Sequence, residues 1–210
     1  MAMELTHVRF ARDLKDRLSI EDEAAYYAGA IYPDSRYMTR IDRNLTHAGS
    51  SPQDPFAGGL SDFEKGWATH LFYDHHAHPL YVQFSPWPEE KAQPGNQVWQ
   101  FISAAKVVED MQSYKAMDGD VDMMLNIDFL ERPNSEDPTV MSAYAQIQKT
   151  LYQQQPTIEH YLEFWLALSP NKQVIDGVMG YVREILTNDP IRKEIEQIYR
   201  RVRSSVVSKV

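Results

Sequence analysis

The sequence predicts an all-α fold, a multi-helix bundle of about eight or nine helices. Apolar residues recur at spacings of three and four along most of the chain, which is the periodicity of amphipathic helices. Asp, Gly, Pro and Asn residues separate these periodic segments, as expected where helices end and turns begin. No internal repeat or low-complexity tract is present, and 210 residues suffice for one domain with its own core. We therefore expect residues 1–210 to form a single helical domain.

The first part of the chain predicts two helices followed by a long loop. Apolar residues on one side indicate the first helix: Leu5, Val8, Phe10, Leu14 and Leu18. A second helix is expected after Ser19, which can cap it with Asp22 three residues on, and Pro33 should end it. Residues 35–60 are rich in Gly, Ser and Pro, which predicts a loop around at most one short helix. A loop of that length inside a domain is commonly functional.

The third predicted helix has the clearest start. Ser61 and Glu64 form a capping box before an apolar run. We expect this helix to last until about Ala77, because Pro79 should end it. Residues 78–97 then hold four prolines and predict a connector with at most a short extended piece.

Six further segments show helical spacing: residues 97–117, 121–133, 138–155, 156–170, 172–188 and 190–207. The last segment is rich in Arg and Lys, which is typical of a solvated face near a helix C-terminus. Residues 95–210 should complete the bundle around a site located in residues 1–80. These C-terminal helices could also cover the site or form the face of a homodimer.

Charge and composition exclude several classes of function. The net charge of −9 argues against a protein that binds the phosphate backbone of nucleic acid. The absence of cysteine excludes disulfides, cysteine-ligated metal sites and a thiol nucleophile. The N-terminal residues are charged every few positions and predict neither a signal peptide nor a membrane span, so we expect a cytoplasmic protein. Motifs of phosphate-binding loops, dinucleotide folds, zincin proteases and serine-hydrolase elbows do not occur.

Histidines concentrate in the first part of the chain, where six of the seven lie at or before residue 78. In the stretch GWATHLFYD, Gly66, His70 and Asp74 follow at spacings of four, so on a helix they share one face. The imidazole and the carboxylate could reach one cation, and Gly66 leaves room one turn before them. A His and an Asp at this spacing are also common as a polar pair on exposed helices, so both interpretations stay open.

Three more residues supply the same ligand types. His7 lies on the first predicted helix at the edge of its apolar side, and Asp34 directly follows the helix-ending proline. His47 lies in the loop that leads to the third helix. Taken singly, these are explained as a surface histidine, a turn-capping aspartate and a loop histidine. Together with His70 and Asp74 they form the mixed His/Asp set of a one- or two-metal hydrolytic site.

The order of these motifs resembles a known family. TH near the N-terminus, GAIYPD, a second TH and then GWATHLFYD are similar to the zinc-dependent phospholipase C/D-like proteins, all-helical metal hydrolases with a Gly-x3-His-x3-Asp helix. More distantly the order resembles the HD-domain phosphohydrolases; here Pro33 stands at the first position of their His-Asp pair and Asp34 matches the second. The resemblance covers residues 6–78 and implies an HD-like or phospholipase C-like helical bundle.

The resemblance implies five ligands of a divalent metal ion, zinc in the first place with iron or manganese as alternatives: His7, Asp34, His47, His70 and Asp74. Asp34 and Asp74 are then also the catalytic candidates. The phospholipases use a processed N-terminus and a later His-x3-Asp or His-x3-Glu pair as further ligands. Here Phe164 stands four residues after His160, and Glu163 stands three after it. We therefore expect this protein to bind fewer metal ions than those enzymes do, and as few as one.

Arginines that could bind a phosphate group lie between two of these ligands. The stretch DSRYMTRIDRN contains Arg36, Arg40 and Arg43. Guanidinium groups bind phosphate through two parallel hydrogen bonds, so the three are candidates for binding a small phosphorylated substrate. Their alternative role is to pair with acidic groups at the surface.

The sequence thus predicts a metal-dependent hydrolase that acts on a phosphate ester through water activated by the metal. One alternative is a non-catalytic helical protein that binds metal or partners and retains the skeleton of the site. A second alternative is a polar network of the five residues without metal. His75, His76 and His78 could be outer ligands or proton shuttles, or else surface groups at the end of the helix.

Overall fold

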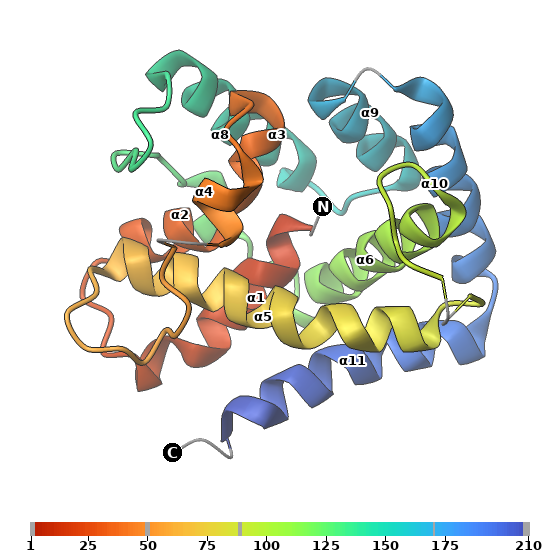
Figure 1. Ribbon diagram of the computed structural model, residues 1–210, viewed down its shortest axis with the longest axis horizontal. Helices are drawn as coiled ribbons and strands as arrows, with labels where there is room; N and C mark the ends of the chain where they lie inside the picture. Colours follow the sequence, from red (N-terminus) through yellow and green to blue (C-terminus); the bar gives the residue numbers. More distant parts are fainter. Residues whose placement is uncertain (1–2, 49–50, 88–89, 170, 208–210) are drawn as a thin grey trace.

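The computed structural model describes residues 3–48, 51–87, 90–169 and 171–207, and these residues contain helices and no strand (Figure 1). The all-α prediction is confirmed. The longer helices among the described residues are α1 (Glu4–Leu14), α2 (Glu23–Ile31), α5 (Asp62–Phe84), α6 (Gln97–Ala116), α8 (Pro138–Tyr152), α9 (Ile158–Leu168), α10 (Lys172–Leu186) and α11 (Asp189–Val207). Shorter segments are α3 (Arg36–Thr39), α4 (Arg43–His47), α7 (Asp122–Leu125) and the 3-10 turns η1 (Lys15–Arg17) and η2 (Tyr32–Ser35).

Helix α5 crosses the width of the molecule, and α1, α2 and α11 pack against it (Figure 1). Helix α6 packs against α10, α1 and α11, and α9 packs between α8 and α10. The buried hydrophobic side chains form one cluster, whose members range in sequence from Met3, the residue before α1, to Val206 in α11. Among the described residues no helix is both long and apolar enough to cross a membrane.

Helices α2 and α5 approach each other closely where they cross at two glycines, Gly29 and Gly66. A Cβ atom added to Gly66 would overlap the carbonyl oxygen of Tyr26, and one added to Gly29 would overlap the carbonyl oxygen of Phe63. The two backbones therefore touch. The sequence interpretation that Gly66 leaves room beside the His70 and Asp74 side chains is wrong, because the backbone of α2 fills that space.

One boundary in the first part of the chain agrees with the prediction, and two features differ from it. Helix α2 ends at Ile31, in front of Pro33 as predicted, and Pro33 occupies the start of η2, where the missing N–H has no intrahelical partner to lose. The side chain of Asp22, not Ser19, caps α2 by accepting a hydrogen bond from the backbone N–H of Ala25. The predicted loop over residues 35–60 contains two short helices, α3 and α4, instead of at most one.

Helix α5 begins at the predicted capping box, since Ser61 accepts from the Glu64 N–H and Glu64 accepts from the Ser61 N–H. Its predicted end is wrong, because the helix continues through Pro79 to Phe84. Proline removes one hydrogen bond of the helix, but the turns around it are held by the fully buried Ala77 and Tyr81. Residues 78–84 of the predicted connector are thus helical, and the described part of residues 85–96 contains no strand.

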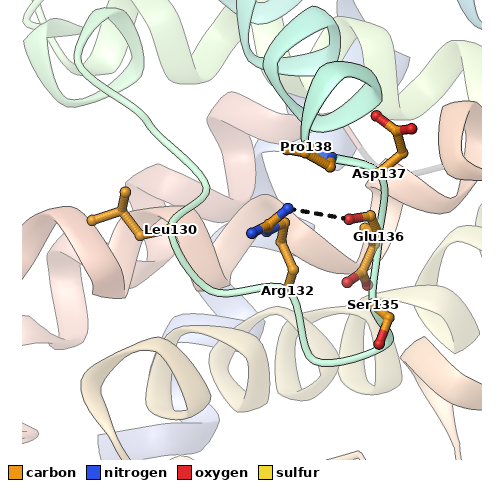
Figure 2. A pocket seen from close by; sticks show the side chains of 6 residues that line it. All are labelled: Leu130, Arg132, Ser135, Glu136, Asp137 and Pro138. Atoms are coloured by element: carbon orange, nitrogen blue, oxygen red, sulfur yellow. Dashed lines mark hydrogen bonds between the residues drawn. The ribbon is translucent and has the colours of Figure 1, made fainter.

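The predicted helix over residues 121–133 is mostly irregular, because only α7 forms there. The chain then runs to α8 as a loop, and hydrogen bonds connect this loop to Tyr32 in η2. The Tyr32 hydroxyl donates to the Glu136 carboxylate and accepts a 2.6 Å hydrogen bond from the side chain of Asn134. This loop borders a surface hollow of about 580 Å³. Figure 2 shows its lining: Leu130, Arg132, Ser135, Glu136, Asp137 and Pro138. The remaining C-terminal helices are confirmed to within about three residues.

Candidate metal centre

The five predicted ligands converge in the folded chain. His7 comes from α1, Asp34 from η2 and His47 from the last residue of α4, while His70 and Asp74 lie one turn apart on α5. His7, Asp34 and His70 are at most 2% exposed. The side chain of His47 is 5% exposed and that of Asp74 is 21% exposed, so the centre opens to one side.

The ligand atoms form two groups, each with all atoms within 4.8 Å of one another. In the first, the Nε2 atoms of His7 and His70 lie 3.8 and 3.9 Å from the two carboxylate oxygens of Asp74. In the second, the Nε2 atoms of His47 and His70 lie 3.8 and 4.0 Å from the carboxylate oxygens of Asp34. Ligand atoms around one cation at bonds of about 2.1 Å lie about 3 to 3.5 Å apart. The ligand atoms of each group thus lie slightly farther apart than they would around a bound cation.

The two groups share one donor atom, the Nε2 of His70. Its Nδ1 lies 2.8 Å from the carbonyl oxygen of Ala30, which can only accept a hydrogen bond. In the neutral ring Nδ1 therefore carries the proton and Nε2 carries the lone pair. A single lone pair binds a single cation, so His70 could serve as a ligand in only one of the two groups at a time.

Buried nitrogen atoms without hydrogen-bond partners support a cation here. Nε2 of His70 and both ring nitrogens of His7 are buried and make no hydrogen bond in the described structure. The two rings stack with their centroids 3.7 Å apart. Because buried polar atoms nearly always have a partner, Nε2 of His70 and one ring nitrogen of His7 fit a ligand that accepts their lone pairs. The His/Asp groups could therefore hold a metal ion.

Protonation states favour metal binding at neutral pH. Burial lowers the pKa of His47 to about 3, and burial together with the neighbouring His70 lowers the pKa of His7 well below its usual value. Burial disfavours charge on Asp74, but the ammonium of Lys106 beside it holds the pKa of that carboxyl well below its ordinary value. The centre thus offers neutral imidazoles and a charged carboxylate, the forms that bind metal.

A cavity of about 880 Å³ opens on the centre. Its polar part is lined by Asp34, His47 and Asp74 together with the cationic Arg36, Arg43 and Lys106. The lining also includes apolar side chains, among them Leu71, Trp99 and Ile102. The C-terminal half thus completes the site through α6, and the expectation of a homodimer stays a prediction.

The other predicted residues divide between the cavity and the surface. Arg36 and Arg43 line the cavity, whereas Arg40 is exposed at the end of α3 and does not line it. His75 and His78 are exposed and lie at its rim. His160 lies outside both ligand groups, and its Nδ1 atom accepts a hydrogen bond from the backbone N–H of Thr157, the residue that caps α9.

Lys106 is the site residue that the sequence analysis missed. Its Nζ donates a 3.1 Å hydrogen bond to the Oδ1 atom of Asp74, and the residue is 7% exposed. The signal was a lone lysine inside an otherwise apolar run, SAAKVV. A charged residue at the buried face of a helix is rare unless it is paired.

Among the described residues, three buried acids besides Glu136 lie outside the ligand groups: Glu4, Glu109 and Asp110. Tyrosine hydroxyls donate to each of them; Tyr144, for example, donates to Glu4 at 2.9 Å. Burial raises the pKa of Glu4 to about 8, that of Glu109 to about 7 and that of Asp110 to about 6. These groups link the stability of the fold to pH.

Replacing Glu4 by glutamine should flatten the pH dependence of stability. Between the unfolded pKa of 4.5 and the folded value of about 8, the folded chain holds one proton more than the unfolded chain at this residue. The free energy of unfolding therefore falls as pH rises through this window, by up to about 1.4 kcal/mol per pH unit. Urea unfolding near pH 5 and near pH 8 should show a smaller difference in Glu4→Gln than in the wild type. Equal differences would contradict the assignment.

Comparison of this chain with known protein families, curated proteins and solved structures finds no match in any of the three.

Proposed function

We propose that the protein is a metal-dependent hydrolase that acts on a phosphate ester. The observation that carries the proposal is the set of buried imidazole nitrogens that have no hydrogen-bond partner and lie close to two carboxylates. Both carboxylates line a cavity, and three cationic side chains line the same cavity. The nitrogens and carboxylates suit a divalent metal ion, and the cationic groups suit phosphate.

The residues that would hold the ion are three imidazoles and two carboxylates: His7, His47, His70, Asp34 and Asp74. This mixture of nitrogen and oxygen donors favours zinc, with iron or manganese as alternatives. A divalent cation supplies Lewis acidity, which makes water a nucleophile near neutral pH. Because both groups need the single lone pair of His70, we expect about one ion per chain.

The remaining roles belong to side chains of the cavity. Arg36 and Arg43 would bind the phosphate oxygens, and Lys106 holds the Asp74 carboxylate in place. Asp34 and Asp74 stay charged, since the pKa of each is lowered, so either carboxylate can bind the ion. The carboxylate that is not bound to the ion would take the catalytic role of accepting a proton from water. The apolar lining residues Leu71, Trp99 and Ile102 would contact the non-phosphate part of the bound ester.

The test is a metal analysis combined with an activity screen. Protein purified without chelator should contain about one equivalent of transition metal and release phosphate or alcohol from a set of phosphomonoesters and phosphodiesters. Dialysis against a strong chelator should abolish the hydrolysis, and zinc, manganese or iron(II) should restore it. No metal after incubation with all three ions would leave the centre as a polar network. Metal without hydrolysis would leave a helical metal-binding protein.

A further inference from the structure

Lys106 presents more hydrogen-bonding capacity to the cavity than its partner uses. An ammonium group has three N–H donors. Among the described residues, Lys106 donates to one carboxylate oxygen, Asp74 Oδ1, and its Nζ lies 5.6 Å from the ring centre of Tyr81. The side chain lines the cavity and is only 9% exposed. A buried charge with unused donors beside a cavity can bind an anion there.

The charge of the cavity wall points to the same kind of ligand. The charged lining residues are three cations and two carboxylates, so the lining carries one net positive charge. They are Arg36, Arg43 and Lys106, and Asp34 and Asp74. The chain as a whole carries a net charge of −9. This local excess becomes larger when a divalent cation binds. A phosphomonoester, with two negative charges near neutral pH, matches such a wall better than a phosphodiester with one.

We infer that Lys106 is a substrate-binding residue that, with Arg36 and Arg43, forms a subsite for the dianionic phosphate of a phosphomonoester. The inference deepens the proposed function and rests on it. In this subsite Lys106 contacts Asp74 with one N–H and the phosphate oxygens with another, while the arginines contact the outer oxygens. The rival role is purely positional, in which Lys106 only holds Asp74 for the metal.

Binding of inorganic phosphate separates the two roles. Isothermal titration of phosphate into the metal-loaded full chain should give a Kd at least about tenfold weaker for Lys106→Met than for the wild type, because a charge-assisted contact is lost. Metal content should stay at the wild-type level. The matched control is Lys115→Met, an exposed lysine on the same helix, which should change neither quantity. The preference of kcat/KM for monoesters over diesters should also fall in Lys106→Met alone.

Two results would overturn the inference. One is unchanged phosphate affinity in a folded, metal-loaded Lys106→Met protein. The other is a Lys106→Met protein that loses its metal but regains the wild-type phosphate affinity when metal is supplied in excess. Lys106 would then be a positioning residue for Asp74 and not a substrate-binding residue. If wild type binds no metal or hydrolyses no ester, the proposed function fails instead, and the same titration on chelator-treated protein still tests the subsite.

A second pair of variants covers the case in which Lys106→Met does not fold. Arg43 is exposed and lines the cavity, whereas Arg40 is exposed and does not. Arg43→Gln should weaken phosphate binding several-fold, and Arg40→Gln should leave it unchanged. Equal phosphate affinities in the two variants would overturn the subsite.

Discussion

Replacing His70 by alanine should remove the bound metal and lower the rate of ester hydrolysis at least about a thousandfold, which corresponds to about 4 kcal/mol of transition-state stabilisation. The reason is that Nε2 of His70 belongs to both ligand groups, so neither can bind the ion without it. Its hydrogen bond from Nδ1 to Ala30 fixes the ring from the other side. Elemental analysis and the activity screen, at matched circular dichroism, measure both effects.

The control for this variant is His76→Ala on the same helix. His76 makes a 2.8 Å contact from Nδ1 to the carbonyl oxygen of Phe72 and belongs to neither ligand group. It should keep full metal and activity. Asp74→Ala and His47→Ala then show which group dominates, because each belongs to one group only. A His70→Ala protein that is folded and holds a full equivalent of metal would refute the centre.

Replacing Gly66 by alanine should destabilise the fold by about 3 kcal/mol or more. The added Cβ would overlap the carbonyl oxygen of Tyr26, a backbone atom that cannot turn aside as a side chain can. Helices α2 and α5 would have to separate, and because α2 carries the Ala30 carbonyl that fixes His70, metal binding should weaken as well. Urea unfolding followed by circular dichroism gives the stability, and metal titration gives the affinity.

Gly180→Ala is the matched control for the glycine variant. Gly180 also lies inside a helix, α10, but it is exposed and a Cβ there meets no atom within 4 Å. Alanine has the higher helix propensity, so this variant should be neutral or more stable by up to about 1 kcal/mol. A Gly66→Ala protein as stable as Gly180→Ala would show that the two helices are not in contact.

In α5 the local sequence signals predicted the start of the helix correctly and its end wrongly. The Ser61 and Glu64 capping box acts between neighbouring residues, so it is visible in the sequence and is found in the structure. The continuation of α5 past Pro79 depends on the burial of Ala77 and Tyr81 against other helices, which no local pattern records. The loss of the predicted helix after residue 125 has a similar cause, since Tyr32 and Glu136 hold that segment as a loop.

The sequence by itself determined the all-α class, because helical periodicity is a local property, and it singled out His7, Asp34, His47, His70 and Asp74 through their motif order. Tertiary structure alone decided which atoms meet. It assigned the lone pair of His70 through a carbonyl on another helix, brought Lys106 to Asp74 from 32 residues away, and left Arg40 outside the cavity. The physical reason is that distances between side chains on different helices depend on how the helices cross, here at Gly29 and Gly66, and not on spacing along the chain.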